Sequence, residues 1–330
     1  MHRSTLVAVL AAAAPAAADP VGLTHIDVEA PHRAAPLEAV VWYPSAPGAV
    51  ERFGENPVFI GHDVVPDGAS AAGTMPVVLL SHGLGGNLRG LGWLAHGLAS
   101  EGAVVVAVNH PGSTTGDLDP ARSLDHGARV RDLGAALDAV AERFDVGRVV
   151  AGGFSLGGWT ALSMAGLRGD LGGYAEHCAA VGDASTHCAD LAAWGVDLTT
   201  LDAGAWDADH RDARVDGAFA LDPGLVWGLG SDAADGVAAD VLLIGFGEGA
   251  DRLLATNFDA SGLTDVLPQA ERMVVVPARH WSALPVCKPG GAAIVAAEGE
   301  PPICDDPAGA NRAAVHAAVV ARAMGFVRGT

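Results

Sequence analysis

The chain has 330 residues, half of them hydrophobic, which is enough to build one large core. Its formal net charge is −20 and Lys288 is its one lysine, so nucleic acids and anionic membrane surfaces would be repelled and are disfavoured as partners. A neutral or cationic small-molecule or lipid substrate is compatible with this charge, and the acidity is typical of a soluble secreted protein.

The N-terminus has the layout of a secretory signal peptide. Arg3 precedes a short apolar run at residues 6–14, and the small residues 16–18 follow it. We expect cleavage after Ala18, which leaves residues 19–330 as a single α/β domain in a secreted or periplasmic protein. No stable membrane insertion is expected, because no stretch approaches the roughly 20 apolar residues that span a bilayer.

The first part of this domain predicts strands that carry no chemistry. Alternating runs at residues 24–29 and 37–43 are typical of antiparallel strands at the edge of a mixed sheet. Residues 44–75 are rich in Pro, Gly and Asp and predict a surface loop around a short strand at 57–60.

A glycine-rich turn follows the next predicted strand. Residues 76–80 are continuously apolar, as in a strand buried on both faces, and Ser-His-Gly-Leu-Gly-Gly follows at 81–86. A His-Gly-x-Gly turn in this position is similar to the loop that supplies an oxyanion donor in lipases and esterases. The predicted donor is the backbone N–H of Leu84, and His82 is expected to brace the loop.

The chain then predicts a helix at 91–100, a strand at 103–108 and a second helix at 126–143, with a polar loop between the strand and the second helix. This loop lies where the carboxyl ends of parallel strands gather, at the edge that holds ligands in open α/β sheets. His110 and His126 are interpreted as rim and helix residues rather than ligands.

Residues 146–162 predict a buried strand, a sharp turn and the start of a helix. Gly-Phe-Ser-Leu-Gly at 153–157 fits the nucleophile-elbow pattern Gly-x-Ser-x-Gly, in which the serine is strained and exposed. Ser155 is therefore the predicted nucleophile, and the N–H of Leu156 at the helix start is the second oxyanion donor. The chain has 44 glycines, so a chance match is the alternative, but the flanking strand and helix argue against it.

Residues 167–213 contain no strand-like run and predict a helical insertion near the site entrance, placed to act as a lid. The four cysteines permit three pairings, of which local spacing favours Cys178 with Cys188 and Cys287 with Cys304, as disulfides of an exported protein. A zinc site is the alternative, but the chain lacks a Cys-x-x-Cys pair.

The last part of the chain predicts strands at 215–221, 239–245 and 272–276 and a helix at 311–327. Residues that follow these strands lie on the same rim as the elbow. His280 follows the last strand, Asp222 follows the first, and Asp251 lies in the loop after the second, so two carboxylates compete for the role of triad acid.

With these pieces in order, the chain resembles the α/β-hydrolase superfamily, and more narrowly the secreted platelet-activating-factor acetylhydrolases and their bacterial relatives described as predicted dienelactone hydrolases. The resemblance rests on Leu-Ser-His-Gly-Leu-Gly at 80–85, Val-Val-Ala-Val-Asn-His at 105–110, Gly-Gly-Phe-Ser-Leu-Gly at 152–157, Phe-Ala-Leu-Asp-Pro at 219–223 and Arg-His-Trp at 279–281. True dienelactone hydrolases carry a cysteine at the elbow, and Ser155 departs from that pattern.

The resemblance implies an α/β-hydrolase fold with a mostly parallel central sheet, helices on both faces and the helical insertion near the active site. It implies Ser155 as nucleophile, His280 as base and Asp222 as acid, with Asp251 kept as the alternative acid. The function expected is that of a secreted serine hydrolase of short-acyl esters or short-acyl phospholipids.

Such a reaction requires neither metal nor organic cofactor. The alternatives are a lipase or polyester hydrolase and, from another class, a non-catalytic secreted binding protein on a hydrolase fold. Trp159 and Trp281 flank the predicted catalytic residues and are expected to narrow an apolar acyl pocket. Oligomeric state is left open.

Overall fold

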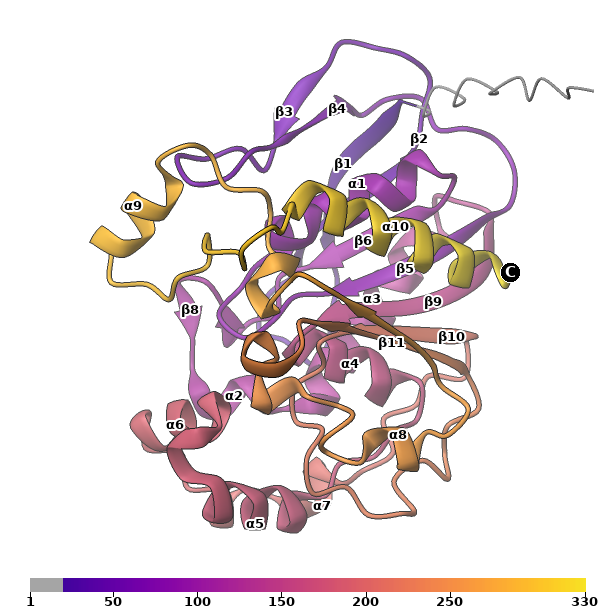
Figure 1. The fold of residues 1–330 in the computed structure, drawn as a ribbon. Helices are drawn as coiled ribbons and strands as arrows, with labels where there is room; N and C mark the ends of the chain where they lie inside the picture. Colours follow the sequence, from indigo (N-terminus) through magenta and orange to yellow (C-terminus); the bar gives the residue numbers. More distant parts are fainter. Residues whose placement is uncertain (1–19) are drawn as a thin grey trace, which may run out of the picture.

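The computed structural model describes residues 20–330, so the predicted signal peptide lies outside the described residues. The strands of its main sheet are β1 (Val21–Val28), β2 (Leu37–Pro44), β3 (Glu51–Phe53), β4 (His62–Pro66), β5 (Met75–Ser81), β6 (Val104–Val108), β9 (Val146–Phe154), β10 (Gly217–Leu221), β11 (Asp240–Phe246) and β12 (Glu271–Val275). Within residues 20–330 they form one ten-stranded sheet in the order β12-β11-β10-β9-β5-β6-β2-β1-β4-β3 (Figure 1). A small separate ribbon pairs β7 (Ser113–Thr114) with β8 (Asp117–Leu118).

The half of the sheet from β12 to β6 is parallel, and the strands inside it are buried on both faces, whereas the edge strand β12 is mostly exposed. Side chains alternate across it, because successive residues of a strand point to opposite faces. Val78 and Leu80 of β5 join one core, and Val77 and Leu79 join the other. This agrees with the mostly parallel sheet expected from the sequence.

Helices cover both faces of the sheet (Figure 1). On one face α1 (Gly92–Ser100) packs beside α10 (Arg312–Arg328), and on the other α3 (His126–Ala141) packs beside α4 (Leu156–Met164). The remaining helices are α2 (Pro120–Ser123), α5 (Leu171–Val181), α6 (Thr186–Ala193), α7 (Ala203–Trp206), α8 (Leu263–Val266) and α9 (Gly291–Ala297). Among residues 20–330, no helix combines the length and the apolar character needed to cross a membrane.

Residues 167–213 hold α5, α6 and α7, and in this described stretch there is no strand. A disulfide between Cys178 and Cys188 ties α5 to α6, with 5.3 Å between the two Cα atoms. A second joins Cys287 to Cys304, with a Cα separation of 5.8 Å. The pairing that the local spacing favoured is confirmed.

Two expectations about the N-terminal part are wrong. β1 and β2 are antiparallel as predicted, but they lie inside the sheet, because β1 also pairs with the short strand β4. Residues 57–60 form no strand. The side chain of Asn56 accepts hydrogen bonds from the N–H groups of Val58 and Phe59, at 2.8 and 2.7 Å, and turns the chain there.

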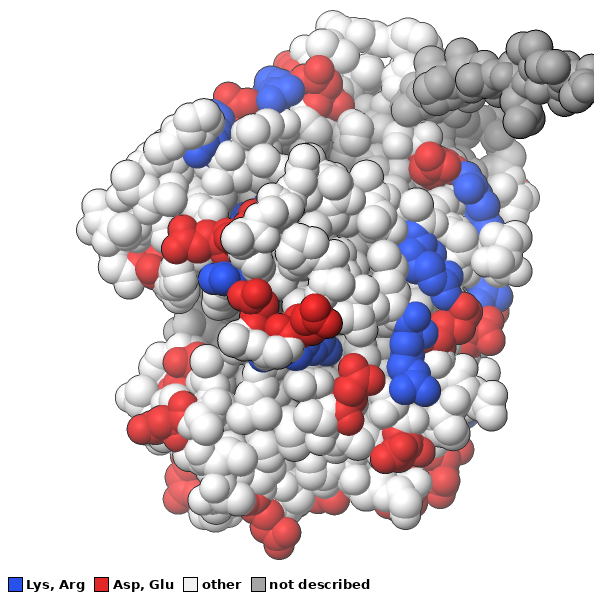
Figure 2. Space-filling model, viewed as in Figure 1, with Lys and Arg blue, Asp and Glu red and all other residues white. Residues whose placement is uncertain are grey.

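Charge is spread over the surface. On the face seen in Figure 2, acidic side chains are distributed over most of the molecule, and basic ones stand among them. Several of the basic side chains are paired, such as Arg322 with Glu271 and Arg328 with Glu101.

Candidate active site

Ser155 stands in the turn between β9 and α4 with φ 55° and ψ −121°, a backbone conformation that a residue with a side chain rarely adopts. Glycine is required at the neighbouring positions, because a side chain there would collide with the backbone. A Cβ on Gly157 would lie 1.8 Å from the carbonyl oxygen of Ser81, and one on Gly153 would lie 2.2 Å from the carbonyl oxygen of Gly157. The Gly-x-Ser-x-Gly spacing is therefore a steric requirement of this turn.

The two predicted oxyanion donors line one cavity. Leu84 follows β5, Leu156 is the first residue of α4, and neither backbone N–H donates a hydrogen bond to another residue of the described chain. The loop that carries Leu84 is braced by His82, whose Nδ1 donates to the carbonyl oxygen of Gly83 at 2.7 Å. Two unused amides beside a strained serine can stabilise negative charge on a substrate oxygen.

His280 and Asp222 are brought together from different strands. Asp222 directly follows β10, and His280 begins the short helix η6 (His280–Ala283) after β12. Nδ1 of His280 lies 3.0 Å from Oδ2 of Asp222, and the carboxylate is fully buried. The imidazole also packs on the ring of Phe154, the residue before Ser155, with 4.5 Å between ring centroids.

Ser155 and His280 are both buried, and no hydrogen bond joins them within residues 20–330. In serine hydrolases without substrate this contact is often long and tightens only when substrate binds. The alternative acid is placed elsewhere. Oδ1 of Asp251 accepts a hydrogen bond from Nη2 of Arg279 at 2.8 Å, and its carboxylate is part-exposed.

The cavity lined by Leu84 and Leu156 measures about 30 Å³, room for roughly two water-sized groups. Its walls are mostly apolar, and α6 of the insertion supplies part of them. The lining residues are Leu84, Leu124, Leu156, Tyr174, His187, Asp190, Leu191, Trp194 and Leu225. Trp159 and Trp281, expected to narrow an acyl pocket, are absent from the lining of this cavity.

Trp159 faces away from the cavity because its position on α4 directs it toward α3. Its indole N–H donates to Nδ1 of His126, and its side chain is buried. His126 is thereby held as a structural residue. Burial lowers the pKa of His126 to about 3, so its ring is neutral near pH 7 and can accept this bond.

The profile of the α/β-hydrolase fold family matches residues 76–195, a stretch that contains the glycine-rich turn at 81–86 and the elbow. The chain has the α/β-hydrolase fold. A ferulic acid esterase from Streptomyces cinnamoneus shares this hydrolase fold with a TM-score of 0.61, at 19% identity, over 96% of this chain and 93% of its own.

A second solved structure with the hydrolase fold is a dienelactone hydrolase-like promiscuous phosphotriesterase from metagenomic libraries. Its TM-score is 0.53 at 14% identity, over 93% of this chain and 99% of its own. Among curated proteins, Cutinase est2 of Thermobifida alba is 35% identical over 106 residues, 30% of this chain. The match spans 32% of that cutinase, about a third of its length.

No sequence pattern marks Arg252, which lies in this hydrolase fold just after the short helix η4 (Gly249–Asp251). Nη1 of Arg252 donates to Oδ1 of Asp222, the oxygen that does not face His280. The backbone N–H of Phe246 donates to the same oxygen at 3.0 Å. The proposed acid therefore has three partners, one of them a buried cation.

His187 of α6 is a second histidine near Ser155. A methyl group on Gly224 would lie 2.7 Å from Cε1 of His187 and 3.6 Å from the amide nitrogen of Leu156. Burial, together with nearby His280, lowers the pKa of His187 to about 4, so the ring is neutral near pH 7. His187 lacks a carboxylate partner among the described residues, which distinguishes it from His280.

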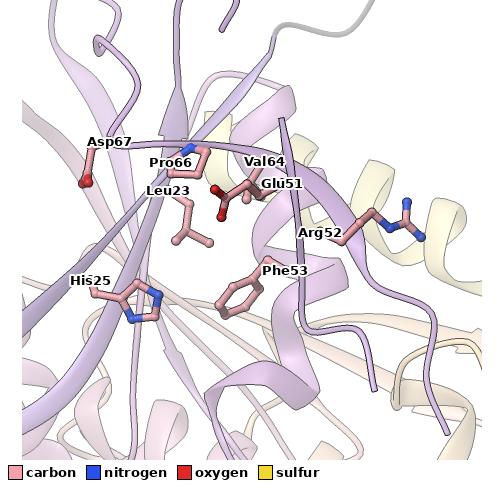
Figure 3. A pocket seen from close by; sticks show the side chains of 8 residues that line it. All are labelled: Leu23, His25, Glu51, Arg52, Phe53, Val64, Pro66 and Asp67. Atoms are coloured by element: carbon pink, nitrogen blue, oxygen red, sulfur yellow. The ribbon is translucent and has the colours of Figure 1, made fainter. Parts of the chain in front are cut away.

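A different cavity, of about 210 Å³, lies at the corner formed by β1, β3 and β4. Figure 3 shows the ring of Phe53 and the carboxylate of Glu51 facing into it, while Arg52 points away. Its other lining residues are Leu23, His25, Val64, Pro66 and Asp67. None of the predicted catalytic residues lies here.

The hydrolase fold holds a second Ser-His-Asp series, under the Leu84 loop. Oγ of Ser81 lies 2.9 Å from Nε2 of His110, whose Nδ1 lies 2.8 Å from Oδ2 of Asp132. All three side chains have no exposed surface. Arg129 donates to Ser81 Oγ at 2.9 Å, and Arg33 donates to both oxygens of Asp132, at 2.8 and 2.6 Å.

Proposed function

We propose that the protein is a serine hydrolase of carboxylic esters, with Ser155 as nucleophile, His280 as base and Asp222 as the acid that orients it. One observation carries the proposal: a strained serine stands beside the unused backbone amides of Leu84 and Leu156, two residues that line one cavity. The short distance between His280 and Asp222 supports the assignment of the base. The esterase and cutinase similarities agree with it.

In the first half of the reaction, His280 takes the hydroxyl proton of Ser155 as Oγ attacks the ester carbonyl carbon. The carbonyl oxygen gains negative charge and accepts hydrogen bonds from the amides of Leu84 and Leu156, each worth about 2.7 to 4 kcal/mol in the barrier. The carbon–oxygen bond to the alcohol then breaks, and His280 gives its proton to the departing oxygen.

In the second half, water hydrolyses the acyl-enzyme. His280 takes a proton from the water as its oxygen attacks the acyl carbon, the same two amides stabilise the oxyanion, and Ser155 leaves with the proton from His280. Asp222 remains ionised and keeps Nδ1 of His280 protonated, which leaves Nε2 free to act as base.

We infer that the acyl group is short. A cavity of about 30 Å³ with leucine walls accommodates few carbons, and α6 covers it. This supports esters of short acids, or phospholipids with a short acyl chain, as the resemblance to platelet-activating-factor acetylhydrolases implied. Rates over p-nitrophenyl esters of increasing chain length, beside a phospholipid with a short sn-2 acyl chain, test this inference.

A polyester hydrolase is the second candidate, favoured by the match to a cutinase. An insoluble polymer must reach Ser155 past α6, so small dissolved esters are the favoured substrates. Turnover that rises on insoluble polyester, compared with a dissolved ester of the same acid, would favour the second candidate.

The nucleophile is tested with a fluorophosphonate probe, which reacts with activated serines. We expect the probe to label the wild-type protein and not Ser155→Ala, with Ser163→Ala, a buried serine of the same helix α4, as the matched control that keeps the label. Equal labelling of wild type and Ser155→Ala would end the proposal.

Export is also proposed, because both cysteine pairs are closed as disulfides, which persist in oxidising compartments. Mass spectrometry of the unreduced protein purified from its native host should find no free thiol. Four alkylatable cysteines would contradict export to such a compartment.

A further inference from the structure

Arg252 is held inside the protein by several separate segments. Besides Asp222, its guanidinium donates to the carbonyl oxygens of Phe246, at 3.3 Å, and Thr256, at 3.2 Å. The cationic carbon lies 4.6 Å from the ring centroid of Phe258, and only 6% of the side chain is exposed.

The fold reserves space for this cation. A Cβ on Gly245 of β11 would lie 2.5 Å from Nη1 of Arg252 and 2.8 Å from its central carbon. Any other residue at position 245 would displace the guanidinium. An arginine that is buried, stacked and accommodated by a glycine occupies a built site and is not a surface contact of chance.

We propose that Arg252 is a positioning residue for the reaction, an inference that rests on the proposed function. It fixes Oδ1 of Asp222, together with the N–H of Phe246, so that Oδ2 faces Nδ1 of His280. Its positive charge also offsets part of the carboxylate's charge. The imidazolium that forms when His280 takes a proton is therefore stabilised less than it would be by an unpaired carboxylate.

This arrangement has a direct consequence for the pH dependence of activity. His280 can act as base only while its imidazole is neutral. An imidazolium that is stabilised less forms only at lower pH, so the enzyme stays active to lower pH. Removing the charge of Arg252 leaves the whole carboxylate charge beside His280. The pH at which half of the activity is lost on the acid side should then move upward.

The other charged or titratable groups around His280 come from separate elements. His187 approaches from α6, and Arg279 with Asp251 forms a pair beside it. Arg312 with Asp306 forms a second pair, which contacts η6 through Ser282, and His316 of α10 donates to the carbonyl oxygen of Ser282 at 3.0 Å. These groups stay unchanged when Arg252 is replaced, so a shift of the acid limb reports on Arg252.

The test measures kcat/KM for p-nitrophenyl acetate against pH in Arg252→Met. We expect the acid limb of the pH profile, the range in which kcat/KM falls as the pH drops, to move up by about one pH unit. The maximum kcat/KM should fall about tenfold, because the carboxylate of Asp222 is no longer held in place. Arg252→Lys should keep the limb within a few tenths of a unit of wild type. The matched control is Arg148→Met, which breaks a surface pair with Asp240 at the opposite end of the strands.

Gly245→Ala is the second variant, since it displaces the guanidinium without removing it and so covers the case in which Arg252→Met does not fold. It should move the limb in the same direction. An acid limb at the wild-type position in the folded variants would overturn the inference, whatever the loss of rate. Fluorophosphonate labelling of Ser155 in the wild-type protein separates the two failures: no labelling ends the proposed function, whereas labelling with an unmoved limb ends only the role of Arg252.

Discussion

Two Ser-His-Asp series lie on the same edge of the sheet, and only one has the features of an active site. Ser155 is strained and stands beside the unused amides of two cavity-lining residues, Leu84 and Leu156, whereas Ser81 ends β5 and its hydroxyl is fully engaged by His110 and Arg129. Each aspartate is paired with an arginine, Asp222 with Arg252 and Asp132 with Arg33.

The comparison shows that short distances between the side chains of a serine, a histidine and an aspartate do not by themselves identify a catalytic site. The series at Ser81 has the shorter and more complete hydrogen bonds, but it offers neither a path for a substrate nor a donor for an oxyanion. Its place beneath the Leu84 loop gives it a structural function: Arg129 connects it to the carbonyl oxygen of His82. The series that we propose as reactive is the one that stands beside unused backbone donors.

The largest expected effect distinguishes the role of Asp222 in activity from the role of Asp132 in stability. Asp222→Asn should lower kcat on the order of 10⁴ while the protein still folds, because His280 is left in the wrong tautomer. Asp132→Asn should instead lower the free energy of unfolding by about 3 to 5 kcal/mol, because it breaks a buried pair with Arg33. Ester hydrolysis and guanidinium unfolding are measured on both variants.

Asp251→Asn serves as the control for Asp222, since its carboxylate contacts Arg279 and not His280. Its kcat should stay close to wild type. A large loss in Asp251→Asn with little change in Asp222→Asn would move the triad acid to the later loop.

The structural series should also make stability depend on pH. Burial lowers the pKa of His110 to about 4, with the nearby Arg129 acting in the same direction, against about 6.5 in an unfolded chain. The unfolded chain therefore binds more protons below pH 6.5. The stability that the neutral ring contributes, on the order of 3 kcal/mol, is present above pH 6.5 and is lost as the pH falls toward 4.

Other buried histidines act in the same direction, since burial also lowers the pKa of His62 and His316 to about 4. We expect the free energy of unfolding in urea to fall between pH 7.5 and pH 4.5. Activity must be read in short assays over this range, so that inactivation by unfolding is separated from protonation of the base. A flat or rising free energy of unfolding would contradict the prediction.

A smaller effect is expected at the second serine. Ser81→Ala leaves Nε2 of His110 and one N–H of Arg129 without a partner, so it should destabilise the protein by about 1 to 3 kcal/mol. Fluorophosphonate labelling of Ser155 should persist, which intact mass spectrometry can measure. Loss of labelling in a folded Ser81→Ala protein would give the buried series a role in catalysis.

Much of the hydrolase fold and of the elbow was predictable from the sequence, because local sterics fix both. The spacing of Gly153, Ser155 and Gly157 follows from backbone collisions within a few residues, and continuous apolar runs mark the parallel strands. The positions of His280 and Asp222 came from strand ends together with the resemblance, and the structure places their side chains in contact.

The features that the sequence did not predict depend on contacts between distant segments. Arg252 reaches Asp222 across 30 residues of sequence, and its loop has no pattern that marks a buried cation. The expectation for Trp159 failed because proximity in sequence to Ser155 does not fix the direction of a side chain on a helix. β1 was expected at the edge because its partner β4 lies in the stretch 44–75, whose Pro, Gly and Asp content predicted a surface loop.

The smallest effect concerns the insertion and the length of the acyl group. Leu191 lies on α6, is 5% exposed and forms part of the cavity wall beside Leu84 and Leu156. Leu191→Ala removes that wall, so longer acyl chains should fit. Because one methylene group in an apolar pocket is worth about 1 to 3 kcal/mol, the ratio of kcat/KM for the butyrate ester to that for the acetate ester should rise about tenfold.

Leu201→Ala is the matched control, because Leu201 belongs to the same insertion and packs in the core below without lining the cavity. Its chain-length profile should follow wild type even if its stability drops. If both variants changed the ratio equally, the insertion would act through its general stability, and the wall formed by α6 would have no part in selecting the acyl chain. A ratio that rises in Leu191→Ala alone assigns acyl selection to α6, the helix that the Cys178–Cys188 disulfide ties to α5.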